Sequence, residues 1–331
     1  MLEIKDLRVR FHDADHDAVR GISLTVADGE IMGLVGESGS GKTVTAMVVS
    51  GLLPRKKADV SGQVLLDGKD LLALDGAAMR KRQGCAISVV FQEPMSAMNP
   101  VMRIGPQVEE ALRVHTKLKA EARKERALQA LRDVDLADAE AIYEKYPHQM
   151  SGGMLQRAMI AAAIISRPKL LLADEPTTAL DVTIQAQILD LLKEVQEKMG
   201  TATILVSHDL GVVARAADRV AIMYAGKIVE IGTAEEVYYD PRHPYTWGLM
   251  QSLPALNKGA SELKTIPGMP PTLIDPPEGD AFACRNPYAL EIDYAQQPPM
   301  FQISDTHFAA TWLLDPRAPK ITPPIGGNAH V

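Results

Sequence analysis

Residues 36–43 read GESGSGKT: Gly36, Glu37, Ser38, Gly39, Ser40, Gly41, Lys42 and Thr43. The apolar run IMGLV comes directly before them and VTAMVV follows, so the pattern predicts a buried strand, a glycine-rich loop and a helix. Glycine allows the loop to turn its backbone N–H groups toward phosphate oxygens, and the positive end of the helix adds to their field. A tight turn with a surface lysine is the alternative, but the strand–loop–helix context favours a phosphate-binding loop.

Length and composition narrow the class of protein. A chain of 331 residues, 46% of them hydrophobic, can form a large domain with an appendage or two domains. The net charge of −7 disfavours a general nucleic-acid binder. The two cysteines, Cys85 and Cys284, are too few for a disulfide framework or a four-thiolate metal site. With no apolar run near membrane-spanning length and no signal-peptide pattern, we expect a soluble protein that reaches a membrane only through a partner.

The first third of the chain combines antiparallel strands with the strand–loop–helix unit. Apolar residues alternate over 2–11, and further strands are expected over 19–26 and 62–68. Asp28-Gly29 is expected to form a hairpin-type turn. Residues 105–146 then have a charged helical pattern, which predicts a helical insertion between strands. The tract KLKAEARKER within it favours a solvated helix face over a binding patch.

Polar side chains follow each of three predicted buried strands. Gln92 follows the strand of residues 87–91, Asp174 and Glu175 follow LLLA, and His208 follows TILVS. Acids at the end of a buried strand are costly unless they bind a cation or take part in chemistry. The carboxyl ends of such strands are where ligands bind in open α/β sheets. Ser151 is a suitable N-cap for a helix that opens with two glycines, whose N–H groups could meet a ligand.

The composition changes after about residue 233. Fifteen of the 22 prolines lie from Pro241 onward, so we expect an irregular segment with one short helix within residues 243–254. IPGMPP and IDPP are predicted to be extended. Strands over 220–224 and 228–231 are expected to close the sheet before this segment. Apolar residues indicate that the segment packs on the rest of the protein: Phe282, Tyr288, Leu290, Trp312 and Leu313.

The motifs together are more specific than any one of them. Along the chain stand GESGSGKT, Gln92, SGGMLQR, LLLADEPTTALD and His208. This order resembles the ATP-binding-cassette (ABC) ATPases over roughly residues 1–231. The resemblance implies an α/β fold of the P-loop NTPase class, with a RecA-like core, an antiparallel β subdomain and a helical subdomain over about residues 93–167. The ATPase domain would span 1–233, and the proline-rich extension 234–331.

The resemblance also implies roles for single residues. ATP would be held by Lys42 and the loop, with Phe11 stacked on adenine, although Phe11 is equally suited to the core. Mg²⁺ would lie near Thr43, Gln92 and Asp174, and Gln92 would also sense the membrane partner. Glu175 would be the general base that polarises the attacking water, and His208 would hydrogen-bond the γ-phosphate. The catalytic set is therefore Glu175, His208 and Lys42.

A second cassette is implied by the SGG motif. Ser151, Gly152 and Gly153 lie too far along the fold to face their own phosphate loop, so in the family they contact the ATP of a partner cassette. Met154 departs from the commonest form of the motif, which has glutamine there. A methionine cannot donate a hydrogen bond, so the contact would depend on Ser151 and the glycine N–H groups.

Two stretches resemble a narrower branch, the importers of oligopeptides, dipeptides and nickel: QEPMSAMNP, and HPYTWGLMQSLP followed by IPGMPP. That branch implies a peripheral protein at the cytoplasmic face of the cell membrane. Its expected partners are two transmembrane permease subunits, an extracytoplasmic solute-binding protein and a second ABC ATPase subunit, either a related chain or another copy. No nucleic-acid partner is expected.

Many members of this branch carry an iron–sulfur cluster on four cysteines of the C-terminal segment. Here the matching positions are Asp280, Asn286, Asp293 and Thr311, and Cys284 alone lies nearby. One thiolate cannot hold such a cluster, so we predict none.

Two other functional classes compete with the importer ATPase. A soluble ABC ATPase acting on DNA or ribosomes would usually bring zinc-binding cysteines, a long coiled-coil insertion or two cassettes, and the sequence has none of these. A non-hydrolysing regulatory cassette is disfavoured because Lys42, Asp174, Glu175 and His208 are all present. The transported substrate cannot be read from the sequence.

Overall fold

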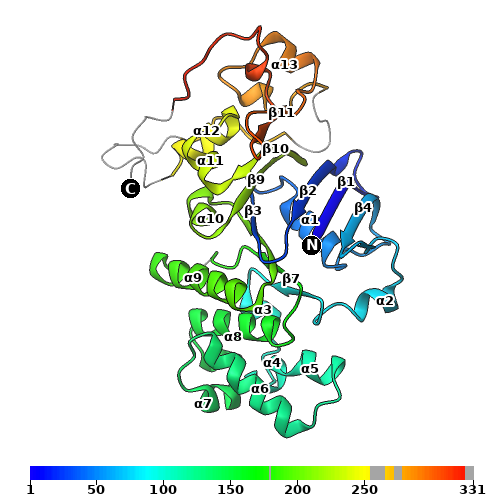
Figure 1. Cartoon of the computed structure of the whole chain (residues 1–331), viewed down its shortest axis with the longest axis vertical. Helices are drawn as coiled ribbons and strands as arrows, with labels where there is room; N and C mark the ends of the chain where they lie inside the picture. The colour runs from blue at the N-terminus through cyan, green and yellow to red at the C-terminus, as the bar shows by residue number, and fades with distance from the viewer. Residues whose placement is uncertain (179, 254–264, 272–277, 325–331) are drawn as a thin grey trace.

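The computed structural model describes residues 1–178, 180–253, 265–271 and 278–324 (Figure 1). The main sheet and a smaller antiparallel sheet lie in the middle of the molecule, with most of the helical insertion at one end and the C-terminal segment at the other (Figure 1). Within the described part of the chain, no helix is both long and apolar enough to cross a membrane. The expected stretch IDPP, residues 274–277, lies outside the described residues.

The antiparallel sheet has the strand order β2-β1-β4-β5. Its strands are β1 (Leu2–Phe11), β2 (Asp17–Val26), β4 (Ala58–Leu66) and β5 (Lys69–Asp70). In β1 and β2, buried apolar residues recur between exposed ones, so one face of this sheet packs on the core. The expectation of a hairpin at Asp28-Gly29 was wrong, because the strands on either side of this turn belong to different sheets.

The main sheet has the order β11-β12-β10-β9-β3-β8-β7-β6. Its parallel centre is formed by β9 (Arg219–Tyr224), β3 (Ile31–Val35), β8 (Ala202–Ser207), β7 (Leu170–Asp174) and β6 (Ile87–Val90). β3 and β8 are buried along their whole length, as expected of strands that are covered on both faces.

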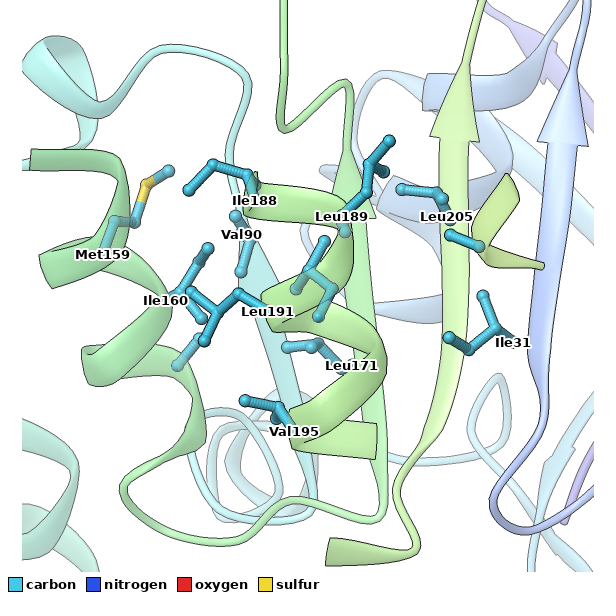
Figure 2. Packing of buried hydrophobic residues seen from close by; sticks show 14 of the residues in the cluster. Ile31, Val90, Met159, Ile160, Leu171, Ile188, Leu189, Leu191, Val195 and Leu205 are labelled. Carbon is cyan, nitrogen blue, oxygen red and sulfur yellow. The ribbon is translucent and has the colours of Figure 1, made fainter. Parts of the chain in front are cut away.

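Alternate residues of the parallel strands enter two separate cores. Ile31, Leu171 and Leu205 pack against the helices on one face (Figure 2). Their neighbours Met32 and Leu172 pack on the opposite face, with the antiparallel sheet. This alternation follows from the period of two in a β-strand, and it fixes the register of each strand relative to both layers.

Helices cover the sheet and form the insertion. Before the C-terminal segment, the described helices outside the insertion are α1 (Lys42–Val49), α2 (Gly76–Arg80), α9 (Val182–Met199) and α10 (Leu210–Ala216). The insertion between β6 and β7 contains α3 (Pro94–Ala97), α4 (Ile104–Val108), α5 (Glu110–His115), α6 (Ala120–Asp133), α7 (Ala139–Glu144), the 3₁₀ turn η1 (Pro147–Gln149) and α8 (Gly152–Ile164). The KLKAEARKER tract is mostly exposed on and before α6.

The C-terminal segment adds two strands to the main sheet. β10 (Lys227–Thr233) pairs with β12 (Phe308–Ala309), and β12 pairs with β11 (Phe301–Gln302). The expectation that residues 228–231 close the sheet was therefore wrong, because an edge strand can accept a partner from far along the chain. The helices and 3₁₀ turns of this segment are α11 (Ala234–Tyr239), α12 (Pro244–Gln251), η3 (Ala283–Arg285), α13 (Glu291–Ala295) and η4 (Trp312–Leu314).

A buried carboxylate fastens this segment to β10. Glu230 is fully buried, and its side chain accepts hydrogen bonds from the backbone N–H groups of Arg242 and His243. His307 lies 2.8 Å from the same carboxylate. Of the expected anchors, Phe282 is buried and the other four are half-buried, so the segment packs on the cassette as predicted.

Candidate nucleotide site

The strand register brings the predicted polar residues to one edge of the sheet. Val35 lies opposite Ser207 on β8, and Asp174 lies opposite Val206. The loop after β3, the acids after β7 and His208 after β8 therefore leave the sheet side by side. Gln92 follows the neighbouring strand β6, two residues beyond Val90.

The loop of residues 36–41 requires glycine at two positions for different reasons. A Cβ on Gly36 would lie 2.1 Å from the carbonyl oxygen of Met223, so the loop passes too close to β9 for a side chain. Gly41 has a φ of 102° and precedes α1 without a side-chain capping bond. The N–H groups that open this eight-residue helix therefore lack a side-chain cap and can meet an anion.

The Lys42 ammonium is turned back onto its own loop. Its Nζ donates to the carbonyl oxygens of Gly36 at 2.7 Å and Glu37 at 2.9 Å. Burial lowers the pKa of Lys42 below its ordinary value, and the carboxylates of Glu175, Asp174 and Glu37 oppose that shift. A buried cation beside acids and uncapped N–H groups is the arrangement that a phosphate chain requires.

The Asp174 carboxylate lies next to the start of α1. The Thr43 hydroxyl donates to it at 3.3 Å. Burial raises the pKa of Asp174; the Thr43 hydrogen bond and Lys42 oppose this, and Glu175 adds to it. A half-buried carboxylate beside a hydroxyl fits Mg²⁺, because oxygen ligands and a divalent charge would offset that desolvation.

Three side chains converge on one oxygen of Glu175. Its Oε2 accepts from Gln92 Nε2 at 3.1 Å and from Thr178 Oγ1 at 2.8 Å, and His208 Nδ1 lies 3.4 Å away. The Glu175 backbone has a φ of 45°, which is uncommon for a residue with a side chain, and its N–H donates to Val206 O. The position of this carboxylate is therefore fixed by both its backbone and its neighbours. Thr178 lies within the LLLADEPTTALD motif, which predicted no role for it.

The predicted group Ser151, Gly152 and Gly153 lies apart from this cluster (Figure 1). Ser151 caps α8 by accepting from the Met154 N–H at 3.3 Å, and Gly152 is exposed. Figure 1 draws α8 with the helical insertion, away from α1 (Figure 1). Phe11, at the end of β1, is half-buried and packs against the core beneath the antiparallel sheet.

We expected the loop to offer its N–H groups to phosphate, but the N–H group next to the C-terminal segment is already bonded. Ser38 and Gly39 are exposed and Ser40 is buried, but the Glu37 N–H donates to Tyr245 Oη at 2.8 Å rather than standing free for phosphate. The Glu37 carboxylate pairs with Arg285. Tyr245 lies within the HPYTWGLMQSLP stretch, which predicted no role for it, and Arg285 lies in no motif that the sequence analysis identified.

The four positions at which the resemblance led us to look for cluster ligands hold oxygen side chains, and all four are buried. Each accepts a bond from a nearby backbone N–H: Asp280 from Phe282 at 3.1 Å, Asn286 from Tyr288 at 2.9 Å, Asp293 from Leu290 at 2.6 Å and Thr311 from Leu313 at 3.3 Å. Oxygen atoms engaged in this way do not fit an iron–sulfur cluster, which is held by thiolates.

Comparisons with known proteins agree with these motifs. A family model described as ABC transporter matches residues 19–178, and one described as Oligopeptide/dipeptide transporter, C-terminal region, matches residues 229–292. The oligopeptide transport ATP-binding protein OppD of Bacillus subtilis is 51% identical, over 100% of this chain and 94% of its own. The dipeptide transport ATP-binding protein DppD of Lactococcus lactis is also 51% identical, over 98% of this chain and 93% of its own.

Solved structures share the fold of the first part of the chain. The ATP-binding cassette MJ0796, in a dimeric post-hydrolysis state bound to ADP and Pi, has a TM-score of 0.64 at 28% identity. The match covers 71% of this chain and 99% of that one. CbiO1 from Clostridium perfringens, described as part of the ABC transporter complex cbiONQ, gives a TM-score of 0.63 over 72% of this chain and 90% of its own.

Proposed function

The chain belongs to the family of ABC transporter ATP-binding proteins, and from that membership we propose that it powers the uptake of oligopeptides or dipeptides across a membrane. The observation that carries the proposal is the convergence of Gln92, Thr178 and His208 on Glu175, beside Lys42 and Asp174. The transport relatives, at 51% identity over nearly the whole chain, favour this importer over a soluble ATPase that acts on DNA or ribosomes.

Phosphoryl transfer requires positioning and charge stabilisation more than covalent chemistry. We propose that the Lys42 ammonium exchanges the carbonyls of Gly36 and Glu37 for the β- and γ-phosphate oxygens of ATP. Asp174, Thr43 and Gln92 would hold Mg²⁺, which when bound neutralises the charge that develops on the phosphates. The uncapped N–H groups at the start of α1 would bind the same phosphates.

Glu175 is the proposed general base. Its carboxylate would accept a hydrogen bond from the attacking water and orient that water toward the γ-phosphate. Donation from Thr178 and Gln92 fixes where the carboxylate points, and His208, which is 57% exposed, can turn toward the γ-phosphate. Because these neighbours hold Glu175 before ATP arrives, little reorganisation remains for the reaction itself.

The site is proposed to be completed by a second cassette. Ser151 uses its oxygen to cap α8, so its O–H remains able to donate to a phosphate. Gly152 and Gly153 would add backbone N–H groups, and Met154 packs against the core instead of contacting the ligand. The second subunit would be a related ATPase chain or another copy of this one.

A cavity beside the helical insertion is the proposed contact with the permease. Its volume is about 410 Å³, and it lies between β6 and the insertion, with Leu52, Phe91, Met98 and Val114 among its lining residues. Phe91 and Val114 expose 43% and 65% of their surface, as expected of a surface that a partner covers. Gln92 follows Phe91 directly, so a permease that presses on this cavity would reach the Glu175 cluster.

We accordingly propose a peripheral protein on the cytoplasmic side of a membrane, bound to two permease subunits and served by an extracytoplasmic solute-binding protein. Residues 1–233 would form the ATPase domain, with the helical subdomain at about residues 93–167. Residues 234–331 would form an extension that lacks an iron–sulfur cluster.

The test is to measure ATP binding, ATP hydrolysis and labelled-peptide uptake in the assembled transporter. Glu175→Gln is expected to keep ATP binding while lowering turnover by on the order of a hundredfold or more, because a general base is lost. Peptide uptake should stop with it. Glu197→Gln, on the exposed face of α9, is the matched control and should behave as wild type. Hydrolysis by the Glu175 variant within a few-fold of wild type would remove Glu175 from this role.

A further inference from the structure

The C-terminal segment reaches the phosphate loop directly. Arg285, on the 3₁₀ turn η3, is buried and points both terminal nitrogens at the Glu37 carboxylate, with N···O distances of 2.6 and 3.0 Å. This is the bidentate geometry in which an arginine–carboxylate pair is strongest and most directional. The two residues are 248 positions apart in the sequence.

A second bond from the same segment meets the same loop residue. Tyr245 on α12 is fully buried, and its hydroxyl accepts the Glu37 N–H at 2.8 Å. Its ring packs against those of Tyr224 and Phe282, with centroid distances of 4.6 and 5.4 Å. Glu37 is therefore held by both its side chain and its backbone from elements outside the cassette motifs.

The arginine is itself immobilised. Its Nε donates to Pro267 O at 2.9 Å, Nη1 donates to Tyr224 Oη at 3.3 Å, and the guanidinium lies over the Tyr224 ring. Although burial lowers the pKa of Arg285, the hydrogen bonds to Glu37 and Tyr224 raise it above its ordinary value, so the guanidinium stays charged. A rigid donor holds its acceptor in place more precisely than a mobile surface side chain does.

Glu37 in turn connects to the catalytic lysine. Its carbonyl oxygen accepts from Lys42 Nζ at 2.9 Å, and it also accepts the Ser40 N–H at 3.2 Å. A change in the position of Glu37 therefore moves the part of the loop that must meet the phosphates. Displacements of about 1 Å in such a site are enough to lower activity strongly.

The segment does not need these bonds to stay attached. β12 pairs with β10, and His307 pairs with the buried Glu230 of β10. Within the segment, Ser304 and Thr306 bond to Glu236. Because the contacts with β10 anchor the segment on the main sheet, the bonds to Glu37 can act on the loop itself.

We propose that Arg285 and Tyr245 are positioning residues of the ATPase. Through Glu37 they hold the phosphate loop in the shape that receives the nucleotide, so residues of the C-terminal segment, outside the cassette motifs, set the affinity for ATP. This inference rests on the proposed ATPase function.

Two conservative variants test the proposal in the complete chain. Arg285→Lys keeps the charge but loses the bidentate geometry, and Tyr245→Phe removes a single oxygen atom. Each should raise the KM for MgATP roughly tenfold, as expected for the loss of one charge-assisted or buried hydrogen bond, while kcat changes less than KM. Thr306→Val, which removes a bond of the segment far from the loop, is the control and should leave KM unchanged.

A double-mutant cycle separates positioning from mere attachment. If Arg285 acts through Glu37, adding Arg285→Lys to Glu37→Gln should raise KM no further than either change alone. Thermal unfolding is followed for every variant. An unchanged or lower KM in folded Arg285→Lys and Tyr245→Phe, with only the melting temperature reduced, would show that the contact is a tether and overturn the proposal.

A failure of the proposed ATPase function would be seen in a different measurement, the hydrolysis of MgATP. If the wild-type chain in its transporter does not hydrolyse MgATP, or if Glu175→Gln leaves hydrolysis intact, the ATPase proposal fails. If the wild type hydrolyses ATP and the Arg285 and Tyr245 variants match it in KM, only the positioning role fails. Because Tyr245→Phe removes only a hydroxyl, it decides the question even where Arg285→Lys does not fold.

Discussion

At the scale of single residues, the chemistry of the site comes from burial and close neighbours. Burial lowers the pKa of Lys42 and raises that of Asp174, because it disfavours the charged form of each side chain. The two opposite charges stabilise each other, and a bound ligand would stabilise them further. Glu175 is held in an uncommon backbone conformation. Such strain persists because the surrounding bonds fix the residue, and it is often found where geometry matters for function.

Lys42→Ala should therefore weaken nucleotide binding itself. The change removes the ammonium that is proposed to exchange loop carbonyls for phosphates, so the affinity for ATP should fall by roughly ten- to a hundredfold. A titration with fluorescent ATP measures it. Lys198→Ala, which removes an exposed lysine paired within α9, is the control. Wild-type affinity in the Lys42 variant would contradict the assigned role.

At the scale of elements, α11 at the start of the C-terminal segment is joined to the β11–β12 turn near its end. The Glu236 carboxylate caps the start of α11 at the Thr233 N–H, 2.9 Å away, and accepts from Ser304 at 2.5 Å and from Thr306. Partial burial raises its pKa, but these hydrogen bonds outweigh that effect and lower the pKa of Glu236 to about 2. One ionised side chain thus connects a helix N-terminus to a strand turn.

This junction should be sensitive to acid. Because the folded pKa lies below the ordinary value of 4.5, the stabilisation is complete above about pH 4.5 and is lost as the pH falls toward 2. Glu236→Gln should lower the free energy of unfolding at neutral pH by about 1 kcal/mol, after allowance for solvent screening, and flatten its pH dependence. Denaturant melts at pH 7 and pH 3.5 measure this. Equal pH dependence in the two proteins would contradict it.

At the scale of the whole molecule, the residues proposed to contact ATP fall into two groups that lie in different parts of the fold (Figure 1). The phosphate loop, Asp174 and Glu175 lie at the sheet edge, whereas Ser151 begins a helix that belongs to the insertion. A solved dimeric cassette with the same fold, at 28% identity, supports the proposal that two chains complete each site. Hydrolysis would then depend on the approach of two subunits, which is how a chemical step can be coupled to movement.

Ser151→Arg tests whether Ser151 contacts the ATP of a partner cassette or ATP bound to its own loop. The isolated chain should bind ATP as the wild type does, because its own loop is untouched, while ATPase activity of the assembled transporter should fall by about tenfold or more. Gln129→Arg, an exposed change on α6, is the control. A parallel loss of ATP binding by the isolated chain would show that Ser151 serves its own loop instead.

The sequence by itself determined the phosphate loop, the strand-end acids, the helical insertion and the α/β class. These features follow from contiguous patterns: apolar runs make buried strands, and glycine followed by Lys42-Thr43 makes a loop that opens a helix. Only the tertiary structure decided which strands share a sheet, that β12 extends β10, and that Arg285 and Tyr245 hold Glu37. The physical reason is that edge pairing and buried ion pairs join residues hundreds of positions apart. Their partners are chosen by packing in three dimensions, and no local period in the sequence records that choice.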